Sequence, residues 1–450
     1  MSKEKAKFAS KIGLVAATVG SAVGLGNVWR FPAEAQANGG AAFLLVYILC
    51  VFLLGIPVMI AEFSLGRAGG SDAVGSFKNL GAKRGWWTVG ALSVLASYAI
   101  LCFYMVVTGW TFEYLVQSVT GYLYEPVNVA KPLGSTLSDS AWQFTTRMNE
   151  FLDGGSNSLI NTYIVLCINL VVLIVGVQKG IERLSNILMP LLFAILLAFC
   201  AVALTMPEAK EGLIYFFKPD FSAITPTTCL NALGQAFFSL SLGMGILVTY
   251  SSYYSSSTKL AKTAVTVSML DLLVAVMMGM IIFPCVMSFG LDNESIAGTS
   301  LVFVTLPEVF AQLPATQLWS ILFFVLLFVA ALTSTISIAE VSVAFLADRF
   351  KLSRVVSCCL VILPLFLFST LCSKSSTLFN LLDNVASNIM LPIVSIGICV
   401  YVGWFAPKDL LQRQLTNDGN LHSRVLPLVK FVIKYVAPLL ISAVLISYFL

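Results

Sequence analysis

"GSAVGLGNVWRFP", residues 20–32, lies inside an apolar stretch long enough to cross a membrane as a helix. It nevertheless carries three glycines, an asparagine, an arginine and a proline. Irregular backbone at membrane depth is tolerated only where it is buried in protein or lines a water-filled cavity, because lipid cannot satisfy its polar groups. The stretch therefore predicts a broken helix whose freed backbone groups form a binding site.

The composition indicates an integral membrane protein. Of 450 residues, 58% are hydrophobic and 11% are charged, whereas soluble domains carry about 25% charged residues. Apolar runs of about 20 residues recur along the chain, and each can cross ~30 Å of hydrocarbon as a helix. We therefore expect an all-α membrane protein that forms a single transmembrane domain over residues 1–450. Its eleven transmembrane helices are expected at about 10–36, 41–67, 86–120, 158–177, 184–206, 229–254, 262–290, 317–348, 354–372, 378–404 and 427–448.

The distribution of Lys and Arg predicts the orientation. With these spans, 20 of the 26 Lys and Arg residues fall on the side of the N-terminus, five fall on the opposite side, and Arg30 lies within the membrane. The positive-inside rule then places the N-terminus in the cytoplasm and, after eleven crossings, the C-terminus outside. The first residues, "MSKEKAKFASK", lack an apolar core and a cleavage site, so they predict a cytoplasmic tail and not a signal peptide. We expect a multi-pass protein of the cytoplasmic membrane, in contact with lipid and not with nucleic acid.

Catalytic and metal-binding signatures are missing from the sequence. The ten cysteines lie almost wholly within the expected spans without a C-x-x-C pair, and the single histidine, His422, falls in a loop. Neither HExxH, GxSxG nor a Walker motif occurs. This pattern argues against an enzyme, an ATP-driven pump and a zinc or disulfide framework.

A second interrupted span lies five spans after the first. "FFSLSLGMGILVTYSSY", residues 237–253, places Gly243 and Gly245 at membrane depth beside Ser239 and Ser241. Matching broken helices in two halves are typical of transporters built from an inverted repeat. We expect a 5+5 repeat with unwound helices 1 and 6: repeat one at about 10–206, repeat two at about 229–404 and an extra helix at about 427–448. The alternative is that the glycines only allow close helix packing.

Several long motifs resemble one known family. They are "GSAVGLGNVWRFP", "NGGAAFLLVY", "GIPVMIAEFSLGR", "GQAFFSLSLGMG", "FVAALTSTISI" and "AFLADRFKLSR". Together they resemble the neurotransmitter:sodium symporter family, in particular its bacterial amino-acid transporters of the leucine-transporter type, over about residues 5–445. Two features depart from the family: a twelfth helix is missing, and Phe8 stands where tryptophan is usual in the inner gate.

The resemblance implies a site for a zwitterionic amino acid, whose two charges need opposite partners in a low-dielectric site. The carboxylate would meet the backbone N–H groups of Gly24, Leu25 and Gly26 and the hydroxyl of Tyr104. The ammonium group would meet the carbonyls of Ala22, Phe238 and Ser239 together with Ser241. The pocket for the side chain is uncharged, which predicts a hydrophobic or aromatic L-amino acid; it would be lined by Ile100, Phe238, Ser241, Met244, Ser334 and Ile338.

The resemblance also implies two sodium ions, each held by the oxygen ligands that a hard cation prefers. The first ion would be bound by the Ala22 carbonyl, Asn27, Ser239, Asp271 and the substrate carboxylate. The second would be bound by carbonyls of Gly20, Val23 and Ala330 and by the hydroxyls of Thr333 and Ser334. Alternatively, these two hydroxyls only bond to the preceding helical turn.

The remaining intramembrane charges are interpreted as gates. The resemblance places Arg30 and Asp383 across an outer vestibule, above a lid made by Tyr104 and Phe238. At the inner side Asp348 would pair with the N-terminal tail at Lys5, although Asp348 is alternatively an interfacial residue without this role. Glu62 is expected to cap unwound backbone of span 1 or 6. Spans 1, 2, 6 and 7 would rock against spans 3, 4, 8 and 9 in alternating access.

Asp271 predicts transport that does not need chloride. The resemblance implies that many animal members have a neutral residue at this position and bind a chloride ion nearby. Tyr47, Gln235 and Ser239 match the surroundings of that ion, and Ala275 offers neither charge nor hydroxyl. Asp271 would neutralise one of two buried sodium charges, each of which costs several kcal/mol without compensation. After sodium leaves, the buried carboxylate is expected to bind a proton, which gives proton antiport; alternatively, Asp271 has only a structural role.

Two other functions remain open, as does the oligomeric state. A proton-coupled amino-acid permease would lack dedicated oxygen ligands for an alkali cation. A gated ion channel would need a continuous ring of carbonyls or charges and no pocket shaped for a substrate.

Overall fold

The computed structural model describes residues 8–81, 85–126, 139–153, 156–289 and 300–449. Within these residues all regular structure is helical, which confirms the all-α prediction. Eight of the described helices are long and apolar enough to cross a membrane, and a bent pair makes a ninth. The eight are Ala41–Gly69 (α3 and α4), Trp87–Thr120 (α6), Val177–Ala203 (α9 and the turn before it), Leu260–Phe289 (α13), Thr316–Phe350 (α15), Arg354–Lys374 (α16), Ser376–Phe405 (α17, α18 and the turn after it) and Leu426–Ser447 (α20 and α21).

The other expected spans are shorter or divided. α8 extends over Ser156–Val175, and its apolar part is Leu159–Val175. The stretch expected to form one span at 229–254 is divided into α11 (Pro226–Ser239) and α12 (Ile246–Ser251). Short helices connect the long ones: α5 (Ala73–Asn79), α7 (Asp139–Asp153), α10 (Ala209–Phe217), α14 (Leu306–Ala311) and α19 (Leu410–Thr416).

The bent pair contains the quoted stretch. α1 (Lys11–Ala22) ends where Val23 adopts an extended backbone, and the helix resumes at Gly26 to continue as α2 (Phe31–Ala37), bent by 53°. Close approach explains two of the glycines. A Cβ atom on Gly24 would lie 2.7 Å from the Ser334 hydroxyl oxygen, and one on Gly26 would lie 2.9 Å from the Phe238 ring.

The second break requires unusual backbone angles. α11 begins with Thr225 as N-cap and Pro226 in its first turn, and it ends at Ser239. Gly243 and Gly245 then adopt φ angles of +78° and +73°, which glycine accepts without steric cost. Ser241 adopts φ +54°, a region that is uncommon for a residue with a side chain. The glycine pair therefore allows the turn that separates α11 from α12.

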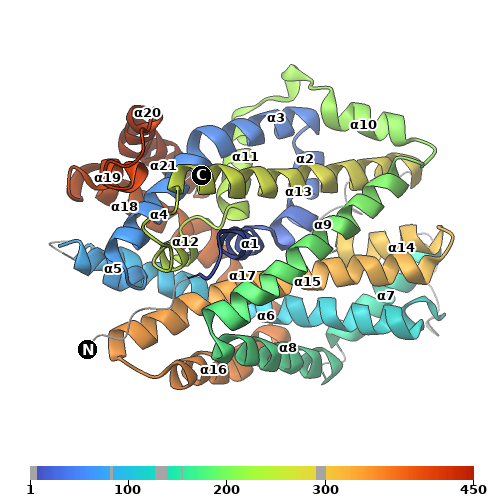
Figure 1. Ribbon diagram of the computed structural model, residues 1–450. Coiled ribbons are helices and arrows are strands. Elements are labelled where there is room, and N and C mark those ends of the chain that lie inside the picture. The colour runs from blue at the N-terminus through green and yellow to red at the C-terminus, as the bar shows by residue number, and fades with distance from the viewer. Residues whose placement is uncertain (1–7, 82–84, 127–138, 154–155, 290–299, 450) are drawn as a thin grey trace.

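The two broken helices lie at the centre of the molecule. Figure 1 shows α1 in the middle, with α3, α11 and α13 on one side and α6, α8 and α16 on the other. α1 packs against α9, α13 and α15, while α12 packs against α4 and α15. The irregular backbone is thus surrounded by helices and not by lipid, as its polar groups require.

Candidate functional site

Side chains tie the two breaks to each other. The Ser241 hydroxyl donates a hydrogen bond of 2.8 Å to the Ser21 carbonyl, and the Gln235 amide donates one of 2.9 Å to the Gly26 carbonyl. The resemblance assigns Ser241 to an ammonium group, but in this structure its hydroxyl satisfies the last turn of α1. The Ser21 carbonyl lies in the last turn of α1, where helical partners run out, whereas the Gly26 carbonyl also accepts a hydrogen bond from the Phe31 N–H.

α6 and α15 carry four of the residues predicted to line the substrate pocket: Ile100, Tyr104, Ser334 and Ile338. Tyr104 on α6 accepts a hydrogen bond of 3.2 Å from the Leu25 N–H, as expected for a hydroxyl beside the first break. The pocket residues predicted around it are uncharged, and all except the half-buried Phe238 are buried: Ile100, Tyr104, Ser241, Met244, Ser334 and Ile338. The structure therefore brings together an apolar wall and the backbone groups of the first break.

The backbone of the second break is held from both sides. The Gly243 N–H donates a hydrogen bond of 2.8 Å to Oε1 of Glu62, which is fully buried on α4. The sequence left open whether Glu62 caps the break in span 1 or the break in span 6. This hydrogen bond assigns Glu62 to the break in span 6. On the other side, Ser97 of α6 donates a hydrogen bond to the Met244 carbonyl. Met244 is thus fixed at its backbone and carries a flexible thioether side chain that is buried.

The side chains assigned to a first cation lie in mutual contact. Asn27 Nδ2 donates to Asp271 Oδ1 at 2.9 Å and to Ser239 Oγ at 3.0 Å, and Ser239 Oγ lies 2.8 Å from Asp271 Oδ2. Tyr47 adds a longer hydrogen bond of 3.3 Å to the same carboxylate. In this structure Asn27 Oδ1 accepts a hydrogen bond from the Gly24 N–H, and Nδ2 faces Asp271. For Oδ1 to coordinate a cation beside Asp271, the Asn27 side-chain amide must flip.

The five oxygens assigned to a second cation converge between α1 and α15. Ser334 Oγ lies 3.5 Å from the carbonyls of both Gly20 and Val23 and 3.1 Å from that of Ala330. Thr333 Oγ1 lies 3.1 Å from the same Ala330 carbonyl. Both hydroxyls thus bond to the preceding helical turn, and the Ser334 hydroxyl also faces the Gly20 and Val23 carbonyls at the end of α1.

The predicted outer gate is only partly assembled in this structure. The Arg30 guanidinium lies over the Phe238 ring, with Cζ 4.6 Å from the ring centre. Asp383 accepts a hydrogen bond of 3.0 Å from Ser387, and no ion pair joins it to Arg30. Arg30 therefore covers the aromatic lid through a cation–π contact.

Asp348 contacts the loop after α4 at the other end of the molecule. It accepts hydrogen bonds from the Asp72 N–H, at 2.9 Å, and from the Ser71 hydroxyl, at 3.2 Å. Lys5, its predicted partner, lies outside the described residues. Phe8 packs edge-on against Tyr250 and Tyr253 and also contacts the ring of Tyr254. These three tyrosines surround the position where the family usually has a tryptophan.

Two polar clusters at this end were missed from the sequence. Glu182 is buried and accepts hydrogen bonds from the backbone N–H groups of Ala9 and Ser10, at 2.7 and 3.0 Å. Glu340 and Arg354 form a bidentate pair with distances of 2.8 and 2.6 Å, and Tyr253 donates to the same carboxylate at 2.8 Å. The signal for Glu340 was present, because a carboxylate inside an apolar span requires a partner. Glu182 gave no comparable signal.

We expect Arg354→Met to destabilise the protein by about 3–5 kcal/mol, since it leaves Glu340 buried without a charge partner. Thermal unfolding of the purified protein in detergent measures the loss. The double variant Glu340→Met/Arg354→Met should recover most of it, because neither charge then remains. Arg413→Met is a matched control: its ion pairs with Asp409 and Asp418 are exposed, so its unfolding temperature should barely change. Equal effects of the two single variants would contradict the prediction.

Comparisons with known proteins find similar sequences and a similar structure over nearly the whole chain. The model of the "Sodium:neurotransmitter symporter family" matches residues 5–128 and 141–450. An uncharacterised sodium-dependent transporter, YhdH of Bacillus subtilis, is 33% identical, with 99% of this chain and 98% of that protein covered. The sodium-dependent dopamine transporter of Bos taurus is 26% identical over 94% of this chain and 67% of its own length. Among solved structures, MhsT in complex with L-phenylalanine is 36% identical, with a TM-score of 0.88, and covers 99% of this chain and 100% of that chain.

Proposed function

Because this chain belongs to the sodium:neurotransmitter symporter family, we propose that it carries a hydrophobic or aromatic L-amino acid across the cell membrane together with sodium. The family is one of transporters and not of enzymes. The observation that carries the proposal is the meeting of two helix breaks beside buried, uncharged side chains, with the buried carboxylate of Asp271 bonded to Asn27 and Ser239. The phenylalanine complex of MhsT supports the substrate class, because that protein has the same fold at 36% identity.

The substrate would bind through its two charges at the breaks. Its carboxylate would lie against the N–H groups of Gly24, Leu25 and Gly26 and the Tyr104 hydroxyl, and its ammonium group against the carbonyls of Ala22, Phe238 and Ser239. The Leu25–Tyr104 hydrogen bond supports this arrangement, because it shows that the Leu25 N–H and the Tyr104 hydroxyl lie next to each other and could both contact one carboxylate. Ser241 would have to release Ser21 before it could contact the ammonium group.

The proposed architecture has eleven spans, with the N-terminus in the cytoplasm and the C-terminus outside. α8 and the divided pair α11–α12 would supply the two spans beyond the nine that length and composition support. The five spans between the start of α1 and the end of α9, and the five between the start of α11 and the end of α18, would form the inverted repeat. α1, α4, α12 and α13 would rock against α6, α8, α15 and α16 to give alternating access.

Two sodium ions would accompany each substrate, one at each oxygen cluster. The first would share the substrate carboxylate, so that ion and substrate strengthen each other's binding reciprocally. Asp271 would supply the negative charge that makes chloride unnecessary. On the empty return step it would bind a proton, which makes the transporter a sodium symporter with proton antiport.

Uptake of labelled amino acid into proteoliposomes tests this function. We expect accumulation of leucine, phenylalanine or tryptophan when sodium outside exceeds sodium inside, and little uptake when choline replaces sodium. A proton-coupled permease would respond to a pH gradient without sodium, and a channel would conduct ions without accumulating any amino acid. Either of these results would contradict the proposal.

Competition defines the substrate class. We expect leucine, tyrosine and tryptophan to displace a bound hydrophobic ligand at least tenfold better than aspartate or lysine, because the pocket holds no charge to compensate an ionised side chain. Scintillation proximity binding with purified protein measures the ranking. Stronger displacement by the charged amino acids would contradict the assigned pocket, while sodium-driven uptake itself would still stand.

A further inference from the structure

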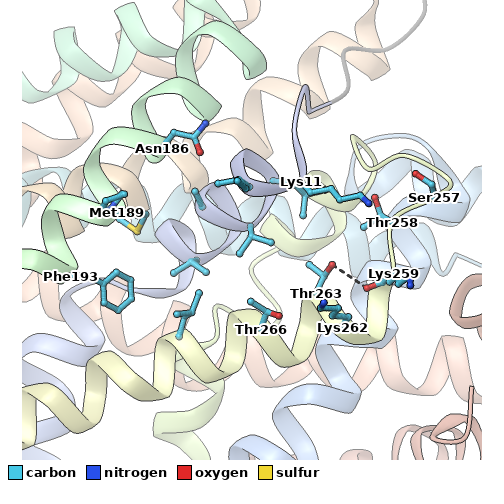
Figure 2. Close-up of a pocket in the computed structure, with 17 residues that line it drawn as sticks. Lys11, Asn186, Met189, Phe193, Ser257, Thr258, Lys259, Lys262, Thr263 and Thr266 are labelled. Carbon is cyan, nitrogen blue, oxygen red and sulfur yellow. Dashed lines mark hydrogen bonds between the residues drawn. The ribbon is translucent and has the colours of Figure 1, made fainter.

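A cavity lies apart from the residues of the proposed substrate site. It encloses about 570 Å³ between α1, α9 and α13 and the loop before α13. Figure 2 shows Lys11, Lys259 and Lys262 gathered toward one part of it, while Met189 and Phe193 of α9 lie toward another. The cavity is thus cationic in one part and apolar in the rest.

Nothing on the described part of the chain neutralises the three lysines. All three are exposed, and no described carboxylate lies within 4.0 Å of their ammonium groups. The loop that carries Lys259 is nevertheless fixed. Arg67 donates a hydrogen bond of 2.6 Å to the Thr258 carbonyl, and Thr263 donates one of 3.2 Å to the Lys259 carbonyl. The backbone that carries Lys259 is therefore held at a defined place, and within the described residues the three lysines have no carboxylate partner.

The remaining wall is apolar and continues onto the outer surface of the helices. Ile12 is 78% exposed although it belongs to a helix that is otherwise largely buried. On α13, the exposed residues Met269 and Leu273 lie three positions after the cavity residues Thr266 and Leu270, so they form the neighbouring stripe. Such a surface fits hydrocarbon chains and not water.

We propose that this cavity binds one anionic diacyl phospholipid, with its phosphate among the three lysines and an acyl chain along α1, α9 and α13. Basic pockets between transmembrane helices on the cytoplasmic side bind acidic headgroups in this way. The long lysine side chains can reach the headgroup level while their stems stay on apolar surface. A free phosphate ion would leave the apolar wall uncovered, and a zwitterionic lipid would leave the three positive charges uncompensated.

The bound lipid would act on transport through α1. This short helix forms one wall of the cavity and ends at the proposed substrate site. A lipid that contacts α1, α9 and α13 together stabilises the present arrangement of these helices. It would therefore shift the conformational equilibrium of the transporter toward states that preserve this arrangement. The binding proposal goes beyond the proposed function; it rests on the proposed placement of the N-terminus in the cytoplasm, but not on which substrate is carried.

The test uses the full-length protein purified in detergent and phosphatidylglycerol with one fluorescent acyl chain. Each lysine near a membrane surface contributes about 1 kcal/mol to attraction of acidic lipid. We therefore expect Lys259→Gln/Lys262→Gln to weaken binding roughly thirtyfold, while Lys259→Arg/Lys262→Arg keeps wild-type affinity. Phosphatidylcholine with the same chains should bind the wild type at least tenfold more weakly than phosphatidylglycerol.

Two further variants distinguish the cavity from general surface charge. Val15→Trp fills the apolar part and leaves every lysine in place, so it should also weaken binding. Lys408→Gln/Lys430→Gln removes two exposed lysines elsewhere and should leave the affinity within twofold. Unchanged binding by Lys259→Gln/Lys262→Gln, an equal loss in the control, or displacement of the lipid by millimolar inorganic phosphate would overturn the proposal. Unfolding temperatures of all variants exclude misfolding as the cause.

Discussion

Asp271→Asn is expected to reduce sodium-driven uptake at least a hundredfold in chloride-free buffer. The carboxylate is fully buried, and its partners Asn27, Ser239 and Tyr47 are uncharged donors. With two sodium ions and a zwitterion bound, the site would carry two positive charges, and Asp271 reduces this to one. Without that compensation a buried ion costs several kcal/mol, and about 2.7 kcal/mol already corresponds to a hundredfold change.

The same variant tests the role of chloride. Wild-type uptake should be unchanged when gluconate replaces chloride, because the compensating charge belongs to the chain. Asp271→Asn should either stay inactive or regain uptake only when chloride is present. Asp409→Asn is the matched control, because the Asp409 carboxylate is exposed and lies just before α19, outside the proposed site. This variant should transport normally. Full chloride-free uptake by Asp271→Asn, or a large loss in wild type on gluconate, would end this assignment.

Proton antiport has its own readout. A pH-sensitive dye trapped in the proteoliposomes should report alkalinisation of the interior as sodium and amino acid enter, because each returning empty carrier would take a proton outward on Asp271. The alkalinisation should require both sodium and substrate. Uptake without any pH change would remove proton antiport while leaving sodium symport intact.

Sequence alone predicts the parts of the site that depend on local chemistry. Gly24 and Gly243 mark the breaks because only glycine permits the close approach at one and the positive φ at the other. Glu62 is predictable as a cap because a buried carboxylate needs a donor. For the glycines and for Glu62 the residue type itself carries the information. Thr333 and Ser334 differ, because adjacent hydroxyls in an apolar helix can equally bond to the preceding turn, and only the family resemblance predicts them as sodium ligands.

The remaining features depend on how helices are placed relative to each other. Glu182 reaches Ala9 and Ser10 only because the turn before α9 lies beside the start of α1, more than 170 positions away along the chain. Arg354 lies at the start of α16 and pairs with Glu340 of α15. Helical periodicity cannot predict this contact, because a loop separates the two helices. The turn of the Asn27 amide toward Asp271 and the bond from Ser241 to Ser21 likewise follow from the packing of the two breaks. No local sequence pattern specifies these distances.

Removal of both hydroxyls in Thr333→Ala/Ser334→Ala is expected to abolish sodium-driven uptake. These residues supply the only side-chain oxygens among the five proposed ligands of the second ion, and Ser334 Oγ lies within 3.5 Å of three of the carbonyls. A hard cation that loses two of five oxygen ligands has no substitute in an apolar environment. Because this ion would join α1 to α15, its loss should also uncouple the first break from the scaffold.

The fold should survive this change, which keeps the test specific. Both hydroxyls also bond to carbonyls one turn earlier, but those carbonyls retain their helical partners when the hydroxyls are removed. Thr335→Ala/Ser342→Ala is the matched control: it removes two buried hydroxyls from the same helix, one bonded only to Leu332 and the other without a described partner. The control should keep sodium-dependent uptake, and both double variants should unfold near the wild-type temperature. Sodium-dependent binding of labelled leucine, measured beside uptake, should disappear or require far more sodium in Thr333→Ala/Ser334→Ala alone. If that variant accumulates substrate like wild type, the two hydroxyls do no more than bond to their own helix.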